Sequence, residues 1–324
     1  MQEEIMARLR FGFTLAVALA WMTTAVAAPI PCRTVIVVAP FPAGSNTDAI
    51  ARLIGEKVGE KLGRPLVIDN KPGAEGQIAA VDVRRSAPDG CRLLFATSGN
   101  LSILPHIRRD PPYDPVRDFT PVAEVGRYNF FLFVNPEMPG KDVRSWVEAV
   151  RERRDGHNYA TANNTNLLAF TEIQRQFGLR MERVNYKGEP EALTDLMQNR
   201  VQAMVATSLG VPYAKDGRLR ALAVMTSQRS PLLPQVPTFA EAGISDLGIL
   251  PWAGIVGPAG MPGETTDALS AAFVSAMEHR NVRDRAEELG FSLNPSPAGN
   301  FAQLVRDQHA IYGRVIREVG LPVQ

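Results

Sequence analysis

Residues 34–48 constrain the fold of this chain more than any other stretch. Their first part, residues 35–38, is an unbroken β-branched run, which is typical of a parallel strand buried on both faces. A turn rich in proline, glycine and small polar residues follows, and a helical pattern then runs through residues 49–62. The free amides at such a helix start point at the carboxyl edge of the sheet, where they can hold an anion without a buried cationic side chain. The segment therefore predicts recognition of a small acid, and by itself it does not predict chemistry.

The size and charge of the chain argue against nucleic acid as a partner. Its 324 residues fit two ordinary domains better than one, and an apolar content of 45% is enough to fill both cores. The 35 basic and 34 acidic residues leave a formal net charge of +1 without a long basic block, and aromatic residues make up only 7%. This balance gives little support to nucleic-acid binding.

The N-terminal residues 1–27 have the pattern of a signal peptide. Arg8 and Arg10 precede an uncharged apolar run at residues 11–26, and the small-x-small motif at residues 25–27 suits cleavage near Ala28. A membrane anchor that stays attached is the alternative, but the apolar stretch is short for a span. We expect export through the inner membrane by a cleavable signal peptide, which would make the mature protein periplasmic.

The two cysteines, Cys32 and Cys91, each lie just ahead of a predicted strand, at residues 34–39 and 92–97. If these strands are neighbours, as in the flavodoxin-like order 2-1-3, the two sulfurs lie side by side. An oxidising compartment would then permit a disulfide, worth about 4 kcal/mol in the chain-entropy model. Two unlinked thiols are the alternative, and a metal site would need more ligands.

The alternation of strand and helix patterns predicts an α/β protein with parallel sheets. A strand at residues 130–134 leaves the first domain, and another at residues 249–257 crosses back. Two crossings imply two hinge strands and a cleft between two α/β lobes. The predicted division is lobe one at residues 28–128 plus 254–324, and lobe two at residues 129–253. Ligands of such sheets bind outside the carboxyl ends of the strands.

Seven segments, in order, extend this interpretation: VVAPFPAGSNTDAIARLI, RPLVIDNKPGAEGQIAA, APDGCRLLFATSGN, PPYDPVRDFTPVAEV, VNYKGEPEALTDLMQNRVQAM, DGRLRALAVMTSQRSPLLPQVPTFAEAG and GPAGMP. Together they resemble the periplasmic solute receptors of tripartite tricarboxylate transporters, also called Bug or TctC-type receptors. The similarity covers Cys32 to Leu321. Each motif alone is weak, but seven in register are specific.

The resemblance implies a two-lobe periplasmic binding protein (Venus flytrap) that closes on one small molecule, usually a carboxylate. Ligands of the family include citrate-like tricarboxylates, dicarboxylates, acidic amino acids, nicotinate and aromatic acids. It also implies transmembrane permease subunits that receive the ligand, and it implies no cofactor. We expect a monomer. A sensory receptor of the same fold is the main alternative function, and a secreted hydrolase is a weaker one.

The same resemblance selects ligand-binding residues, here with Ser45 in place of the family's usual second glycine. In lobe one they are Phe41, Ala43, Gly44, Ser45, Asn46, Thr47, Asp48, Ser98, Gly99 and Asn100. In lobe two they are Thr161, Asn163, Asn164, Tyr186, Lys187, Gly188 and Thr207. Backbone amides of residues 43–48 and 98–100 would hold the carboxylate.

Several of these residues have ordinary structural alternatives. Asp48 is expected to accept amide hydrogen bonds at its helix start and not to contact the ligand. The asparagines of residues 163–166 suit a polar ligand but are also common in turns. Lys187 would either pair with a second carboxylate or face solvent at the cleft lip, and Trp252 would either wall the pocket or pack in the hinge.

The departures from the family cluster in lobe two. The loop at residues 161–166 lacks glycine, and Ala206 stands where the family often has an aspartate. The loss of an acidic group predicts a ligand without a protonated amine, because a desolvated amine needs a counter-charge.

Catalysis has little support in the sequence. The four histidines form no HExxH pair, and neither a GxSxG elbow nor a GxGxxG or phosphate-binding loop is present. We therefore predict a non-enzymatic receptor without catalytic residues and without a metal site.

Overall fold

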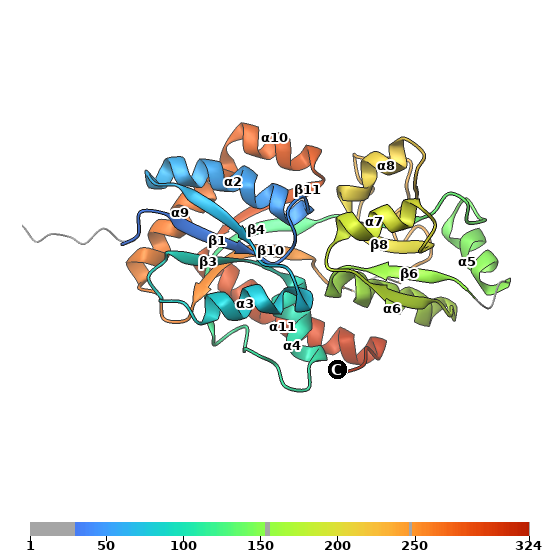
Figure 1. Cartoon of the computed structure of the whole chain (residues 1–324), viewed down its shortest axis with the longest axis horizontal. Coiled ribbons are helices and arrows are strands. Elements are labelled where there is room, and N and C mark those ends of the chain that lie inside the picture. Colours follow the sequence, from blue (N-terminus) through green and yellow to red (C-terminus); the bar gives the residue numbers. More distant parts are fainter. Residues whose placement is uncertain (1–29, 153–155, 246–247, 324) are drawn as a thin grey trace, which may run out of the picture.

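The computed structural model describes residues 30–152, 156–245 and 248–323, which fold around two separate sheets (Figure 1). The predicted signal peptide, residues 1–27, lies outside these residues. In the described part of the chain, no helix combines the length and apolar character that crossing a membrane requires.

Lobe one is the six-stranded sheet and the helices that cover it. Its strands lie in the order β11-β4-β10-β3-β1-β2. The bounds are β1 (Val35–Ala39), β2 (Leu66–Asn70), β3 (Arg92–Thr97), β4 (Phe119–Tyr128), β10 (Trp252–Pro258) and β11 (Phe291–Pro297). The helices are α2 (Asn46–Leu62), α3 (Gln77–Arg84), α4 (Leu104–Ile107), α9 (Gly263–Glu278), α10 (Arg280–Glu288) and α11 (Ala298–Val319), with short turns η2 (Ala74–Gly76) and η3 (Gly99–Ile103). In Figure 1, α2 and α10 lie above this sheet, and α3, α4 and α11 lie below it.

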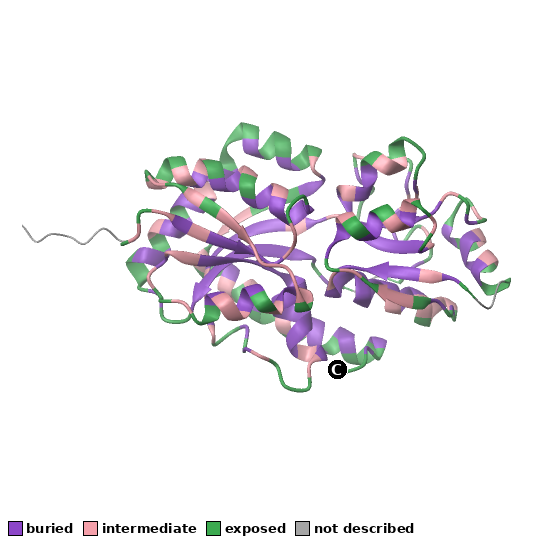
Figure 2. Cartoon of the chain, viewed as in Figure 1, coloured by how far each residue is buried: buried purple, intermediate pink, exposed green. Residues whose placement is uncertain are grey.

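Lobe two is the five-stranded sheet, in the order β7-β6-β8-β5-β9, and its helices. The strands are β5 (Phe130–Val134), β6 (Asn158–Thr161), β7 (Glu182–Asn185), β8 (Ala203–Thr207) and β9 (Arg220–Val224). The helices are α5 (Val143–Glu152), α6 (Asn164–Phe177), α7 (Glu189–Met197) and α8 (Val211–Lys215), with the short turn η4 (Ser208–Gly210). The central strands of both lobes are buried, whereas the outer helix faces are exposed (Figure 2).

Both sheets are mixed, so the prediction of parallel sheets holds for only some of the strand pairs. The pairs β1–β2, β1–β3, β6–β7 and β6–β8 are parallel as expected. Strand β10 is antiparallel to both β3 and β4, and β5 is antiparallel to both β8 and β9. The reason is the connection between the lobes: β5 and β10 each enter a sheet from the cleft, where the parallel strands of that sheet end, so they run in the opposite direction.

The chain changes sheets across a single residue, since β4 ends at Tyr128 and β5 begins at Phe130. It returns to the first sheet with β10, which begins at Trp252. The fold is therefore the predicted α/β two-lobe arrangement with two crossing segments. The residue limits given above for the two lobes remain a prediction.

Cys32 and Cys91 form a disulfide, with their Cα atoms 5.8 Å apart. The strands that follow them, β1 and β3, are parallel neighbours. The bond thus joins the chain ahead of β1 to the chain ahead of β3, on the side of lobe one opposite to the carboxyl ends of these strands.

Candidate functional site

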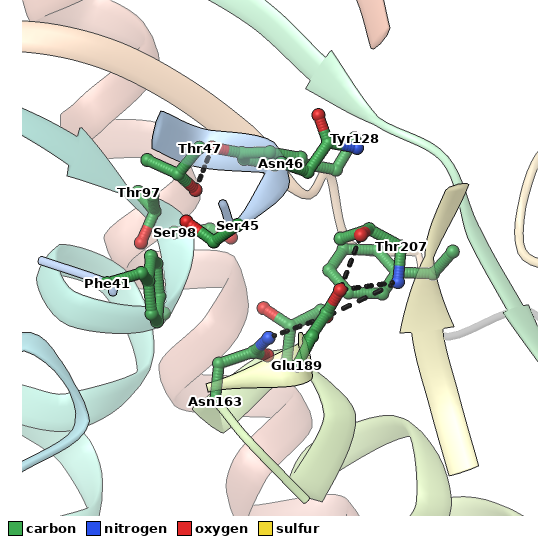
Figure 3. A pocket seen from close by; sticks show the side chains of 13 residues that line it. Phe41, Ser45, Asn46, Thr47, Thr97, Ser98, Tyr128, Asn163, Glu189 and Thr207 are labelled. Atoms are coloured by element: carbon green, nitrogen blue, oxygen red, sulfur yellow. Dashed lines mark hydrogen bonds between the residues drawn. The ribbon is translucent and has the colours of Figure 1, made fainter. Parts of the chain in front are cut away.

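A cavity lies where the two lobes face each other. The segments that follow β1 and β3 form one wall, and the starts of α6 and α7 with the end of β8 form the opposite wall (Figure 3). Its lining residues are Phe41, Ser45, Asn46, Thr47, Thr97, Ser98, Gly99, Tyr128, Phe130, Asn163, Thr165, Glu189 and Thr207. The location at the carboxyl ends of strands is the one that α/β sheets use for ligands.

The start of helix α2 forms the first part of the lobe-one wall. Ser45 is its N-cap residue, and its hydroxyl accepts a hydrogen bond from the Asp48 amide at 3.2 Å. The amides of Asn46 and Thr47 have no acceptor among the described residues, as expected for the first turn of a helix. Since both residues are buried and line the cavity, these amides form a preorganised place for an anion.

Asp48 stands behind this wall and holds the loop in shape. Its carboxylate accepts hydrogen bonds from the Gly44 amide at 3.0 Å and from Asn70 Nδ2 at 2.9 Å, and it pairs with Arg52 at 2.9 Å. Burial raises the pKa of Asp48, but the hydrogen bonds from Arg52, Gly44 and Asn70 outweigh it, so the net pKa lies below its usual value. Asp48 is therefore a charged brace for the loop and does not line the cavity.

The end of β3 forms the second part of the lobe-one wall. The Thr97 amide donates a hydrogen bond to the Asn100 side-chain oxygen at 2.9 Å, and the Tyr113 hydroxyl donates to the Asn100 carbonyl at 2.6 Å. These two bonds fix the loop. The Thr97 hydroxyl is left buried without a hydrogen-bond partner among the described residues. A buried hydroxyl in this state costs stability unless a ligand pairs with it.

Aromatic side chains supply the apolar surface of the cavity. The Tyr128 hydroxyl shares a hydrogen bond of 2.7 Å with the Thr47 hydroxyl, and its ring packs edge-on against Phe291 with centroids 4.9 Å apart. Burial raises the pKa of Tyr128, so it stays a neutral phenol at physiological pH. Phe130 and Phe41 complete this part of the lining.

Glu189 puts a carboxylate into the lobe-two wall. It is the first residue of α7, and only 6% of it is exposed. Its oxygens accept hydrogen bonds from the Thr207 amide at 3.2 and 3.3 Å, from the Thr207 hydroxyl, from Asn163 Nδ2 at 3.2 Å and from Asn166 Nδ2 at 3.4 Å.

No described lysine, arginine or histidine forms an ion pair with Glu189. Burial outweighs the hydrogen bonds from the four donor groups, so the net pKa of Glu189 lies above its usual value. A buried acidic side chain is rarely found without a basic partner. This carboxyl group distinguishes the lobe-two wall from the lobe-one wall.

Direct contacts between the lobes close the site. Asn46 Nδ2 donates to Ser208 Oγ at 2.8 Å, and Asn164 Nδ2 donates to the Gly99 carbonyl at 3.0 Å. At the outer rim, Arg183 of lobe two pairs with Glu75 of lobe one at 3.1 Å. These bonds cross the cleft, so the structure is the closed form of the two lobes.

Residues 50–321 match the protein family described as the tripartite tricarboxylate transporter family receptor, TctC. This chain belongs to the TctC family. The predicted resemblance, and with it the prediction of a non-enzymatic solute receptor, is thereby confirmed. Among the residues that the structure describes, no cluster of three or more histidine, cysteine or acidic side chains could hold a metal ion.

Individual relatives agree with this assignment over nearly the whole chain. BugT of Bordetella pertussis is 29% identical over 311 residues, which cover 92% of this chain and 94% of BugT. The structure of MatC from Rhodopseudomonas palustris with bound malate matches with a TM-score of 0.83 at 31% identity and covers 89% of this TctC-family chain and all of MatC (100%). An R. palustris protein solved with adipate matches with a TM-score of 0.85 at 29% identity, covering 90% and 98% of the two chains.

The structure brings together only part of the residues selected from the sequence of this TctC-family protein. Those that line the cavity are Phe41, Ser45, Asn46, Thr47, Ser98, Gly99, Asn163 and Thr207. Ala43 and Gly44 are exposed at the turn, and Asp48 and Asn100 support the loops from behind.

The remaining selected residues of lobe two lie elsewhere. The Thr161 hydroxyl accepts a hydrogen bond from Arg183 Nε at 2.8 Å, and Asn164 bridges the lobes. Tyr186 and Lys187 line a separate outer cavity, where Lys187 is exposed. Gly188 is the N-cap residue of α7.

Sequence reasoning missed five lining residues: Thr97, Tyr128, Phe130, Thr165 and Glu189. The signal for Glu189 was an acidic residue directly after the Tyr186-Lys187-Gly188 motif. Trp252, one of whose two possible roles was to wall the pocket, does not line it. It is fully buried, stacks edge-on against Phe301 at 5.5 Å and donates from Nε1 to Ser102 Oγ at 3.2 Å, so it packs at the hinge.

Proposed function

We propose that this TctC-family receptor closes its two lobes on one small carboxylate outside the cytoplasm and delivers it to transmembrane permease subunits of a tripartite tricarboxylate-type transporter. The observation that carries the proposal is the set of unpaired donors in the lobe-one wall. These are the amides of Asn46 and Thr47 and the hydroxyl of Thr97. Donors held open in a closed cavity are matched by a ligand that only accepts, and a carboxylate is the commonest small group of that kind.

The expected affinity follows from these donors. Hydrogen bonds to a charged group contribute about 1.5–3 kcal/mol each when both partners are desolvated. Three of them, reduced by the cost of ordering the ligand and closing the lobes, are consistent with binding in the micromolar range or tighter. The structures of relatives with malate and with adipate support a carboxylate as the ligand class.

The location follows the same reasoning. The predicted signal peptide at residues 1–27 and the family's assignment to transporters support a periplasmic receptor. The disulfide between Cys32 and Cys91 fits an oxidising compartment. Cell fractionation, with and without residues 1–27, tests this part of the proposal.

A thermal-shift screen of the purified mature protein against mono-, di- and tricarboxylates tests the ligand class. A ligand that binds only the folded state raises the melting temperature by mass action. We expect at least one carboxylate to stabilise the protein without being turned over, and small-angle scattering to show compaction when it binds. Stabilisation by none of the carboxylates, or turnover of an ester, peptide or phosphate substrate, would contradict the proposal.

A further inference from the structure

We infer that Glu189 makes this site select carboxylates that carry a protonated amine at their far end, and reject dicarboxylates of the same length. The inference rests on the proposed function, because it assumes that the lobe-one wall holds the ligand carboxylate. With the carboxylate held there, the lobe-two wall selects the chemical group at the other end of the ligand.

Glu189 already occupies the hydrogen-bond donors of lobe two that could hold an anion. The Thr207 amide and hydroxyl and the side-chain amides of Asn163 and Asn166 all donate to its carboxylate. Glu189 also stands in the first turn of α7, where a helix favours negative charge. Lobe two therefore contains a complete carboxylate site, and the carboxylate in it belongs to the protein. A second carboxylate of a ligand would find these donors in use.

This arrangement also leaves Glu189 without an ion pair to any described lysine, arginine or histidine. The nearest basic residues along the chain are engaged or turned away: Arg183 pairs with Glu75 and donates to Thr161, and Lys187 is exposed in the outer cavity. A ligand carboxylate beside Glu189 would bring two acidic groups together in a site shielded from water, where both could not remain ionised. An ammonium group would instead supply the counter-charge that Glu189 lacks, and the rings of Phe41, Tyr128 and Phe130 favour a cation over an anion.

Asn46, a lining residue whose side chain reaches from lobe one to Ser208 of lobe two, carries an unpaired acceptor. Asn46 donates from Nδ2 to Ser208 Oγ and, at 3.4 Å, to the carbonyl of Leu289, which can only accept. The orientation of the amide is thus fixed, and its Oδ1 is left buried without a partner among the described residues. An acceptor of this kind can receive an N–H from an ammonium group, whereas it repels a carboxylate.

This inference departs from the expectation, drawn from the sequence, that the ligand lacks a protonated amine. That expectation followed from Ala206, which lies in the core of lobe two, on β8. The acidic group comes from a different element, the start of α7. The unpaired donors belong to lobe one and Glu189 belongs to lobe two (Figure 3). The ligand that fits them therefore carries its carboxylate at one end and its amine at the other.

Calorimetric titration of the mature protein with matched probes tests the inference. The probes are three pairs that differ only at one end: 3-aminopropanoate and butanedioate, 4-aminobutanoate and pentanedioate, and 5-aminopentanoate and hexanedioate. At the best length we expect the amine to bind about tenfold tighter than its dicarboxylate, or more, at neutral pH. Glu189→Gln should cost the amine about tenfold and leave the dicarboxylate unchanged or tighter, because the like charge is gone.

Two further variants keep the result interpretable. Glu191→Gln removes the same charge from an exposed position of the same helix, and it should leave both ligands unaffected. Glu189→Asp keeps the charge, and it should retain part of the preference for the amine even where Glu189→Gln lowers the melting temperature. Equal binding of both members of every pair by the unaltered protein, or a preference that survives Glu189→Gln, would overturn the inference and leave the proposed function intact. Failure of every carboxylate in the screen to bind would instead contradict the proposed function.

Discussion

The two walls of the interlobe cavity are built from the same kind of element and differ in how their donors are used. In lobe one, the start of α2 and the end of β3 leave amides and a hydroxyl unpaired. In lobe two, the starts of α6 and α7 and the end of β8 offer comparable donors, but these are directed at Glu189. The comparison shows that one helix start can attract an anion while another, similarly placed, already holds one.

The largest expected effect comes from the disulfide between Cys32 and Cys91, which lies in lobe one and has no counterpart in lobe two. Replacing Cys32 and Cys91 together by serine opens a loop with a sequence separation of 59 residues. In the chain-entropy model this lowers the free energy of unfolding by about 4 kcal/mol. Chemical denaturation and calorimetry of the variant should both show this lower free energy of unfolding, and we expect the loss to fall on lobe one. An equal loss in the β5–β9 sheet of lobe two would show that the lobes unfold as one unit.

The next largest effect comes from Asp48, which supports the lobe-one wall but is not one of its donors to the ligand. Asp48→Ala removes the hydrogen bonds to Gly44 and Asn70 and the pair with Arg52, and should cost about 2–3 kcal/mol of stability along with carboxylate affinity. Because the folded pKa of Asp48 lies below its usual value, its stabilising contribution is present above the unfolded pKa and is lost as the pH falls through the folded pKa.

Denaturation midpoints between pH 7 and about pH 3 measure this dependence. The Asp48→Ala variant should show a smaller loss of stability on acidification than the unaltered protein. Identical acid profiles for the two proteins would remove Asp48 as a charged brace of the loop.

A third prediction tests whether the Thr97 hydroxyl is a ligand donor. Thr97→Val keeps the shape of the side chain and removes a hydroxyl that has no partner in the protein. Carboxylate binding should weaken by about 1.5–3 kcal/mol, while the stability of the ligand-free protein stays the same or rises. Titration and thermal melting of the same sample measure both quantities.

Ser102→Ala is the matched control for Thr97→Val. Its hydroxyl accepts from Trp252 Nε1 at 3.2 Å and does not line the cavity, so the change should cost stability and not affinity. If both variants lose stability alone, the lobe-one wall does not use its hydroxyl for the ligand.

The smallest expected effect comes from one of the hydrogen bonds that cross the cleft between the two walls. Asn164→Ala removes the bond from Asn164 Nδ2 to the Gly99 carbonyl, which crosses the cleft. We expect about 1 kcal/mol less favourable ligand binding, because the closed form loses one neutral hydrogen bond. Small-angle scattering should then show incomplete compaction at a ligand concentration that closes the unaltered protein. Unchanged affinity and compaction would mean that this contact does not contribute to closure.

Much of the fold could be predicted because its signals are local. The β-branched run of β1, the capping residues of α2 and the alternation of strands and helices follow from the preferences of neighbouring residues. The hinge region could be predicted less well. Strands β5 and β10 read as ordinary buried runs, and nothing local tells whether such a run lies parallel or antiparallel to its neighbours.

The sequence by itself determined the lobe-one wall, because Ser45, Asn46 and Thr47 are contiguous and a helix start sets the direction of their amides through the backbone alone. Only the tertiary structure decided the opposite wall. Glu189, Asn163 and Thr207 come from three separate elements, and only folding encloses the Glu189 carboxyl group with these donors around it. Burial and pairing are properties of the packed chain, so the surroundings of Glu189, on which the proposed preference for an amine rests, could not be read from any one segment.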